Sequence, residues 1–325
     1  MARVTIRDIA AAAQVSPSLV SAVLNRNTAI RYSKEREKQI LELVKKTGYR
    51  PNRAAQVLGK GRSRQIGVLS YSPADPSVAR LIGELEKQLS RRGYSAIYGF
   101  WSDFGSIRGA FDSVLAHPLD GLICMHNELA ELIPSGLPTV FYSDVPGRCC
   151  VMLNYGRYFD LVLSYLAGLG HRKAGFFGWQ SRELYDLFRE KAVRLNITPV
   201  KKWSPKSSGF FEDARTAALE LFSKGERPEA LLCRNDVVAF AVINAAEASG
   251  IRVPEDLSVT GFDDIPPAAY FIPPLTTCGA PAERIASSLL DRLFDGARPG
   301  LLEIDMDLKT RATCAPNRKK SAVSC

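Results

Sequence analysis

The chain has 325 residues, of which 46% are hydrophobic and 24% are charged. This length fits two or three packed domains, because a domain usually has roughly 100 to 200 residues. The composition is that of a globular protein, and no stretch approaches the roughly 18 to 20 apolar residues of a membrane helix. Membrane-spanning and disordered proteins are therefore excluded. Since the N-terminus lacks the apolar run of a secretory signal, we expect a cytoplasmic protein.

Seven cysteines and three histidines are scattered along the sequence. The cysteines form no Cys-x-x-Cys pair, and an odd set of them in a chain without an export signal argues against a disulfide framework. Neither residue type has the spacing of a zinc site. We therefore expect reduced thiols, no metal and no cofactor. The adjacent Cys149 and Cys150 have two interpretations, an oxidant sensor or, in preference, a structural pair.

Positive charge is concentrated near the N-terminus. Residues 1–64 contain 14 Lys and Arg but 4 Asp and Glu, whereas the rest of the chain is close to neutral. A basic block of this kind is expected for a domain that binds a polyanion, because each neutralised phosphate releases condensed counterions. A solvated basic surface gives the same charge pattern, so the local sequence has to decide between the two.

The basic block is predicted to contain three short helices. Thr5, with an acidic residue three positions later, has the pattern of a capping box at the start of the first helix. Ser16 and Pro17 pair a favoured cap residue with proline at the first position of a second helix. Ser33 begins a third helix, which Gly48 ends. Three small helices with a tight turn between the first two are typical of a helix-turn-helix domain.

The same block contains recognisable motifs: Val4-Thr-Ile-Arg-Asp-Ile-Ala10, Val20-Ser21, Val23-Leu24-Asn25 and Gly48-Tyr-Arg-Pro-Asn52. They resemble the N-terminal signature of the LacI/GalR family of bacterial transcription regulators, and the resemblance extends over almost the whole chain. It implies a DNA-binding domain at residues 1–50, a homodimer, and a second helix that lies in the major groove. The DNA-contacting residues implied are Thr5, Ser16, Pro17, Ser18, Ser21, Ala22, Asn25, Arg26, Asn52, Arg53, Ala55 and Leu58.

Two positions of the second helix depart from the family pattern. The family most often has Thr and Arg where this chain has Leu19 and Ala22. Ala22 cannot make the bidentate contact with guanine that an arginine makes, which leaves only an apolar contact, for example with a thymine methyl group. We therefore expect an operator that differs from those of the best-known relatives.

Residues 51–64 are predicted to form a short helix followed by a basic linker. An ordinary interdomain tether has the same composition, whereas a phosphate-binding loop is excluded because the G-x-x-x-x-G-K-[ST] spacing is missing. The family resemblance implies a hinge helix that folds on the operator and pairs across the dimer. Leu58 would then enter the minor groove, where an inserted apolar side chain kinks the duplex.

From Gln65 onward, short β-rich runs alternate with amphipathic helical segments. The predicted strands are 66–71, 94–100, 120–125, 138–142, 174–178, 230–233 and 257–262. The predicted helices are 77–92, 106–117, 181–195, 211–224, 235–249 and 281–295. Such alternation predicts an α/β core of two doubly wound parallel-sheet lobes, with helices on both faces of each sheet. Ligands of such sheets bind beyond the carboxyl ends of the strands, which predicts a cleft between the lobes.

The core also contains Leu169-Gly-His-Arg-Lys173, Asn235-Asp236, the run 250–264 and Pro274-Leu-Thr-Thr277. These are similar to effector-domain motifs of the same family, whose core resembles periplasmic sugar-binding proteins. The resemblance implies a core at 65–316 in which the chain crosses between lobes near residues 167, 277 and 307. The implied ranges are 65–167 with 278–306 for the first lobe, 168–277 with 307–316 for the second, and 317–325 for a basic tail.

The resemblance further implies a small-molecule effector, a sugar or a related compound. The residues at matching positions are Tyr71, Asn154, Arg182, Phe210, Asn235, Phe262 and Asp263. Each has a structural alternative, since an asparagine can simply cap a helix and an aromatic residue can belong to the core. Leu153 and Leu184 replace the aspartate and arginine of sugar-binding members, which removes the strongest directional contacts to a hydroxyl-rich ligand.

Catalysis has no support in the sequence. Asp263 and Asp264 are adjacent, but neighbours at a strand end point in opposite directions and do not share a substrate. No Gly-x-Ser-x-Gly motif or readable nucleophilic cysteine is present. We therefore expect no enzyme but a homodimeric, sequence-specific repressor that binds a pseudo-palindromic operator and is controlled by an effector. The alternatives are an effector-independent DNA-binding protein and, less favoured, a solute-binding protein.

Overall fold

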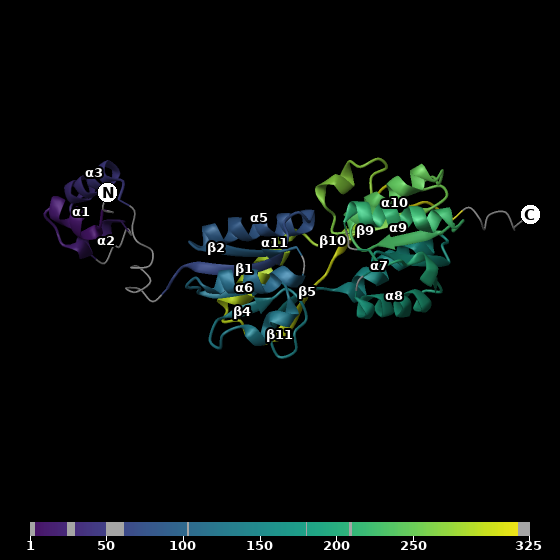
Figure 1. Cartoon of the computed structure of the whole chain (residues 1–325), viewed down its shortest axis with the longest axis horizontal. Coiled ribbons are helices and arrows are strands. Elements are labelled where there is room, and N and C mark those ends of the chain that lie inside the picture. The colour runs from purple at the N-terminus through teal and green to yellow at the C-terminus, as the bar shows by residue number, and fades with distance from the viewer. Residues whose placement is uncertain are drawn as a thin grey trace, which may run out of the picture. The chain divides into compact units, whose positions relative to one another are not determined.

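The computed structural model describes residues 4–24, 30–49, 62–102, 104–179, 181–207 and 210–317. The chain divides into two compact units (Figure 1). The first comprises residues up to Arg64 together with Pro118–Asp120, and the second comprises the remainder. We refer to the first unit as the head and to the second as the core.

The head contains α1 (Ile6–Ala12), α2 (Pro17–Leu24) and α3 (Lys34–Thr47). Thr5 closes a capping box in which its hydroxyl accepts from the backbone N–H of Asp8, while the Asp8 carboxylate accepts from the Thr5 N–H at 2.7 Å. Ser33 caps α3, and Gly48 ends it with a φ of 65°, a conformation that glycine adopts without a steric penalty. The three predicted helices are confirmed.

The three head helices pack around a small apolar core. The core-forming side chains are Ile9, Ala10, Ala13, Val20, Val23, Ile40 and Tyr49. Arg36 of α3 donates from Nη1 to the carbonyl of Ala13 at 3.2 Å, which ties α3 to the turn between α1 and α2. These contacts fix the orientation of α2 within the head.

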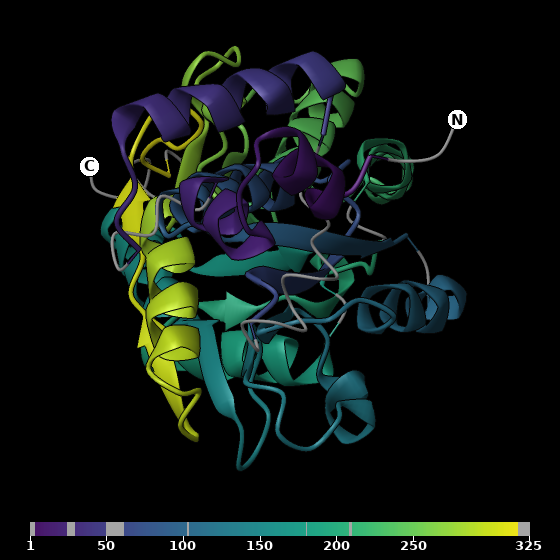
Figure 2. The ribbon, with the colours of Figure 1, turned by 90° about the vertical axis from the view of Figure 1, so that its left-hand side faces the viewer.

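The first lobe of the core is built on a six-stranded parallel sheet with the order β11-β5-β4-β3-β1-β2. The strands are β1 (Gln65–Tyr71), β2 (Ser95–Trp101), β3 (Gly121–Cys124), β4 (Thr139–Phe141), β5 (Cys149–Leu153) and β11 (Gly300–Ile304). The helices are α5 (Pro76–Arg91), α6 (Ile107–Leu115) and α11 (Ala282–Phe294), with 3-10 turns η1 (Phe104–Ser106) and η2 (Asn127–Leu132). Helices α5 and α11 pack against each other, and Figure 2 shows α11 and α6 on opposite sides of the sheet.

The second lobe has a six-stranded sheet with the order β12-β10-β9-β8-β6-β7, in which only β12 is antiparallel to its neighbour. The strands are β6 (Lys173–Phe177), β7 (Thr198–Pro199), β8 (Ala230–Cys233), β9 (Ser258–Phe262), β10 (Thr276–Gly279) and β12 (Asp307–Lys309). The helices are α7 (Tyr155–Gly168), α8 (Arg182–Arg194), α9 (Phe211–Ser223) and α10 (Asp236–Ala248), with 3-10 turns η3 (Lys201–Trp203) and η4 (Pro266–Ala269). In Figure 1 the pair α9 and α10 lies on one side of this sheet, and the pair α7 and α8 lies on the other.

The predicted fold class is confirmed, and each strand and helix expected in the core is present within a few residues. The sequence did not predict α7 or the strands β5, β7, β10, β11 and β12. Strand β5 contains Cys149 and Cys150, whose exposed fractions are 3% and 1%. These two thiols are therefore part of the packed sheet, as the structural interpretation of the pair required.

The prediction that the chain first crosses between lobes near residue 167 is wrong. Strand β5 ends at Leu153 in the first sheet, whereas α7 already packs against α8 and β12 of the second lobe. The first crossing is therefore at Asn154, and α7 belongs to the second lobe because its apolar face, with Tyr158 and Phe159, packs there. The other crossings lie between β10 and α11 and between β11 and β12.

The described crossing segments are tied together at Asp305. Its carboxylate accepts a hydrogen bond from Nδ2 of Asn154 at 3.2 Å and lies 3.6 Å from Nε of Arg157. The guanidinium group of Arg284, at the start of α11, donates to the backbone carbonyl of Asp305. Segments that join the lobes at three separate points in the sequence thus share one junction.

No helix among the described residues combines the length and the apolar composition that are needed to cross a membrane.

Packing of α6 on the first sheet depends on a close approach at Gly99 of β2. A Cβ atom at this position would lie 2.7 Å from the Ala110 carbonyl oxygen and 2.7 Å from a Val114 methyl carbon. We expect Gly99→Ala to lower the free energy of unfolding of the core by about 1–3 kcal/mol through overpacking, measured by urea denaturation of the full chain.

Gly109 provides the matched control, because it lies in α6 itself and a Cβ there meets nothing within 4 Å. Gly109→Ala should be neutral or stabilising, by up to about 1 kcal/mol, since alanine has the higher helix propensity. Equal effects of the two substitutions would contradict the packing explanation.

Candidate functional site

The first candidate site is the exposed start of α2 in the head. Ser16, Pro17 and Ser18 are exposed, and Ser21 is half-buried. The hydroxyl of Ser16 accepts from the backbone N–H of Leu19 at 3.2 Å and lies 2.9 Å from the hydroxyl of Ser18. The start of the helix thus presents hydroxyl groups on a backbone that is fixed by the apolar core of the head.

The structure corrects the expectation for Ala22. This residue is buried, with an exposed fraction of 3%, so its methyl group is not on the accessible surface of the head and does not offer the apolar base contact that was expected. Helical spacing gives the side of the helix on which a residue lies, but not what covers that side. The predicted contacts Asn25, Arg26, Asn52, Arg53, Ala55 and Leu58 lie outside the described residues.

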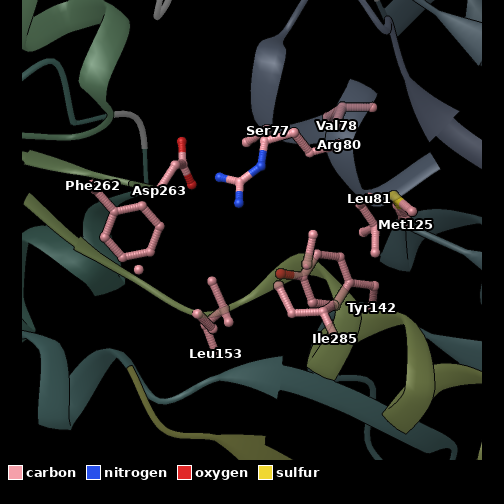
Figure 3. A pocket seen from close by; sticks show the side chains of 13 residues that line it. Ser77, Val78, Arg80, Leu81, Met125, Tyr142, Leu153, Phe262, Asp263 and Ile285 are labelled. Atoms are coloured by element: carbon pink, nitrogen blue, oxygen red, sulfur yellow. The ribbon is translucent and has the colours of Figure 1, made fainter. Parts of the chain in front are cut away.

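The second candidate site is a cavity between the two lobes of the core, with a volume of about 70 Å³. The first lobe supplies the α5 side chains Ser77, Val78, Arg80 and Leu81, together with Met125, Tyr142, Leu153, Ala282 and Ile285. The second lobe supplies Phe262, Asp263, Gly279 and Ala280. Most of this lining is apolar, and Figure 3 shows the Arg80 guanidinium group and the Asp263 carboxylate facing each other over it.

Arg80 connects the two lobes directly. It lies on α5 of the first lobe, and its Nη1 donates to the backbone carbonyl of Asp264 in the second lobe at 2.7 Å. The Asp264 carboxylate in turn accepts from Nη2 of Arg311 at 2.7 Å. Asp264 is therefore engaged on both its backbone and its side chain, while Asp263 faces the cavity. The two neighbouring carboxylates do not share one site, in agreement with the sequence-based expectation.

Asp263 sits in an unusual backbone conformation with a φ of 105°, and Asp264 follows with a φ of 48°. The Asp263 N–H donates to the carbonyl of Cys278 on β10 at 2.8 Å. A Cβ atom on Gly279 would lie 2.7 Å from the Asp263 carbonyl carbon. The turn after β9 is thus pressed against β10, and this close approach aims the Asp263 carboxylate into the cleft.

The electrostatics of the cavity are dominated by the burial of carboxylates. Desolvation raises the pKa of Asp263 well above its usual value, and the nearby Asp236 and Asp75 raise it further, whereas Arg234 and Arg80 lower it. Desolvation also raises the pKa of Tyr142 well above its usual value. The hydroxyl of Tyr142 therefore stays protonated and is available as a hydrogen-bond donor.

Asp236 lies behind the cavity wall and is buried, with an exposed fraction of 1%. Its carboxylate accepts from the Thr277 hydroxyl at 2.5 Å and from the Ile265 N–H at 2.8 Å. Gly261 leaves the space for this carboxylate, since a Cβ atom there would overlap Oδ1 of Asp236. Burial raises the pKa of Asp236 to about 7 despite these two donors.

Of the seven effector residues predicted from the sequence, Phe262 and Asp263 line the cavity. Phe262 is held by Tyr155, whose ring is stacked at a centroid distance of 5.6 Å, and by Tyr158, in an edge-on contact at 4.9 Å. Tyr71 and Phe210 come from different lobes and have ring centroids 6.5 Å apart, and neither is among the residues that line the cavity.

The other three predicted residues have local structural partners. Asn235 caps α10 by accepting from the Val238 N–H at 2.8 Å, and Asn154 caps α7 by accepting from the Arg157 N–H at 2.9 Å. The Arg182 side chain has an exposed fraction of 86%. In this conformation Asn235 therefore acts as a helix cap, which is the structural alternative considered for it.

The sequence analysis missed Arg80, Met125, Tyr142 and Ile285 as cavity residues. Met125 and Tyr142 are the last residues of two predicted parallel strands. Because ligands of parallel sheets bind beyond the carboxyl ends of the strands, both residues could have been predicted. Arg80 and Ile285 lie on helices and had no such signal. Leu153 does line the cavity, whereas Leu184 packs against the apolar core.

Residues 5–52 match the model of the bacterial regulatory proteins of the lacI family, and residues 163–314 match a periplasmic binding protein-like domain. The HTH-type transcriptional repressor PurR of Edwardsiella ictaluri is 30% identical over 312 residues, covering 90% of this chain and 89% of that protein. The chain belongs to the LacI family. PurR of Mannheimia succiniciproducens is 27% identical over 311 residues, with coverages of 90% and 91%.

Solved structures show the same fold as this LacI-family chain. The Lac repressor dimer bound to operator and the anti-inducer ONPF has a TM-score of 0.86 at 24% identity, covering 97% of this chain and 100% of that one. The complex of the transcriptional regulator CelR with cellobiose has a TM-score of 0.68 at 22% identity, covering 96% and 100%. The family resemblance seen in the sequence is confirmed, and the PurR relatives are named as repressors, not as enzymes.

The raised pKa of Asp236 predicts a pH-dependent stability of the core. The unfolded carboxyl titrates near its ordinary value of roughly 3.9, whereas the folded one titrates at about 7. Between these values the folded state holds a proton that the unfolded state has lost, so stability falls as the pH rises through this window and then levels off. One pKa unit corresponds to about 1.4 kcal/mol, so we expect a loss of a few kcal/mol.

Asp236→Asn removes this titration, so urea unfolding of the full chain at about pH 5 and about pH 8 should differ less in the variant than in the parent protein. Asp112→Asn, on the exposed face of α6, is the control and should leave the pH dependence unchanged. An identical pH dependence in Asp236→Asn and the parent protein would show that Asp236 does not cause the pH-dependent stability.

Proposed function

We propose that the chain is a transcriptional repressor that binds a pseudo-palindromic DNA operator as a homodimer. The observation that carries this proposal is the head, a helix-turn-helix unit at the end of a chain whose first 64 residues contain 14 Lys and Arg against 4 Asp and Glu. The PurR relatives are named HTH-type transcriptional repressors, and the Lac repressor structure is that of a dimer bound to operator. These names support the proposal.

The exposed start of α2 is the proposed reading surface. Recognition helices contact base edges with their N-terminal residues, and a hydroxyl group can either donate to or accept from a base. We propose contacts from Thr5, Ser16, Pro17, Ser18 and Ser21. Contacts from Asn25, Arg26, Asn52, Arg53, Ala55 and Leu58 rest on the family resemblance alone. Ala22 is not included because its methyl group is buried.

The cleft between the lobes is the proposed effector site. An effector that binds one arrangement of the lobes more tightly than another shifts the core toward that arrangement, and with it the DNA affinity of the dimer. Phe262 and Asp263 are the predicted residues that the cavity supports directly. Tyr71, Asn154, Arg182, Phe210 and Asn235 rest on the family resemblance for this role.

We further propose that the protein works in the cytoplasm, where its DNA partner is found. The proposed organisation keeps the DNA-binding domain at 1–50, the hinge at 51–64, the core at 65–316 and the tail at 317–325. Within the core, the first lobe ends at Asn154 and resumes with α11, in place of the boundary at 167.

The test is a selection of bound fragments from the genome of the source organism by the purified full chain, at low and at moderate salt. Recovery of one shared pseudo-palindrome at both salt concentrations is expected for specific readout by a dimer. Uniform recovery that is lost at moderate salt would mean phosphate contacts alone and would overturn the proposal of a specific operator.

The structure of the head also predicts the effect of a substitution at Ser18 on DNA binding. Ser18→Glu places a negative charge at the exposed start of α2, so we expect the affinity for the selected fragment to fall by roughly tenfold or more through repulsion of phosphates and bases. Fluorescence anisotropy with a labelled fragment measures this change, and circular dichroism checks that the helices persist.

Ser223→Glu is the matched control, because Ser223 is exposed on α9 of the second lobe. It introduces the same charge into the same protein and should leave the affinity for the fragment within about twofold. A similar loss in both variants would point to overall charge and away from α2 as the reading helix.

A further inference from the structure

The cavity between the lobes has a chemistry unlike that of a site for a hydroxyl-rich ligand. Leu81, Met125, Leu153, Phe262 and Ile285 form an apolar wall. A carbohydrate presents donors and acceptors on most of its atoms, and each needs a polar partner when it is buried. This wall supplies none, so a sugar would lose more hydrogen bonds with water than it would regain here.

The polar part of the same cavity contains a guanidinium group and a carboxyl group. Arg80 reaches in from the first lobe and Asp263 from the second, and Figure 3 shows their charged groups facing each other. The surrounding charges also alternate, since Asp75 and Arg234 both lie near enough to influence the pKa of Asp263. A ligand carboxylate would be attracted by the Arg80 guanidinium group, and a ligand ammonium group would stabilise the ionised form of the Asp263 carboxyl group.

Figure 3 shows the Arg80 and Asp263 groups together at one side of the space and Leu153 and Met125 at others. We infer that the cleft binds a small zwitterionic α-amino acid with an apolar side chain, its carboxylate on Arg80, its ammonium group on Asp263, and its side chain against Leu153 and Met125. This inference rests on the proposed role of the cleft as the effector site and names the chemical class of its ligand.

The bonding capacity of Arg80 fits a carboxylate. Only Nη1 of its guanidinium group is engaged within the described residues, by the Asp264 carbonyl. The remaining N–H groups are available for the planar fork that recognises a carboxylate. On the opposite side of the cleft, Asp263 is held by its backbone bond to Cys278 and presents its carboxylate to the same space.

The size of the cavity favours a small ligand. Its volume of about 70 Å³ is well below the roughly 300 Å³ at the lower end of ordinary ligand pockets. An amino acid of the size of alanine or valine requires a modest widening of the cleft, whereas a disaccharide requires a much larger one. Arg80, a long side chain with several rotatable bonds, joins the two lobes at this point through its hydrogen bond to Asp264.

Burial raises the pKa of Asp263, and an ammonium group next to it would lower that pKa again. Binding of the zwitterion should therefore release protons, which calorimetry detects as a dependence of the measured heat on the buffer. The charged or titratable groups around Asp263 are Asp75, Arg80, Tyr142, Tyr155, Tyr158, Arg234, Asp236 and Asp264.

The test uses the full chain and isothermal titration with L-alanine, L-valine, L-leucine and D-glucose. The best amino acid is then compared with the analogues that lack one charge. For L-valine these are 3-methylbutanoate, which has no amino group, and 2-methylpropylamine, which has no carboxylate. We expect the amino acid to bind roughly tenfold or more tightly than either analogue, because each loses one charge-assisted hydrogen-bonding partner.

Variants locate the site. Arg80→Met and Asp263→Asn should each weaken binding of the amino acid by roughly tenfold or more. Arg108→Met and Asp112→Asn make the same chemical changes in an exposed ion pair on α6 and should leave binding unchanged. Thermal unfolding of each variant checks that the fold is retained.

The inference is overturned if no amino acid binds, if D-glucose binds more tightly, if a singly charged analogue binds as tightly, or if Arg80→Met and Asp263→Asn leave binding intact. DNA affinity is measured separately by anisotropy with and without the amino acid. Binding of the amino acid without any effect on DNA affinity would support the ligand class and overturn the effector role. A DNA affinity that responds to D-glucose alone would support an effector and overturn the ligand class.

Discussion

The buried carboxylate of Asp236 organises the side of the second lobe that faces the cleft. It accepts from Thr277 of β10 and from the Ile265 N–H after β9, so one side chain at the start of α10 fixes two neighbouring segments. Between them, Asp263 and Asp264 adopt positive φ angles, which cost of order 1 kcal/mol or more each for residues with a side chain. The backbone can hold this turn because the groups that anchor it are buried. The turn directs the Asp263 side chain into the cleft and the Asp264 carboxylate toward Arg311.

From this turn the chain of contacts continues into the first lobe. Arg311 engages the Asp264 side chain, and Arg80 engages its carbonyl from across the cleft. The wall of the cavity is therefore not assembled from independent side chains, because a shift of the turn would move the Asp263 carboxylate and the anchor of Arg80 together. Under the proposed effector role, a ligand that contacts this turn would affect both lobes through few atoms, and it would shift the core only if it binds one arrangement more tightly than another.

The sequence predicted the elements better than the site. Helix caps such as Thr5 and Ser33 and the apolar strands of the core are local signals, and the structure places them as expected. The first crossing between the lobes was placed too late, near residue 167, because which sheet covers an apolar helix face is a tertiary question. Arg80 had no signal at all, since nothing in a helical pattern distinguishes a solvated arginine from one that reaches across a cleft. Asn235 and Asn154 carried a family signal, but their side chains serve helix ends.

The junction at Asp305 constrains the mechanics of the core. Asn154, Arg157 and Arg284 all contact this residue. The segments that connect the lobes are therefore held together near one point. Sliding of one lobe past the other would stretch some of these connections and slacken others, whereas rotation about the pinned point leaves their lengths nearly unchanged. These contacts thus favour rotation of the lobes about the junction at Asp305, rather than sliding, as the motion that would open the cleft.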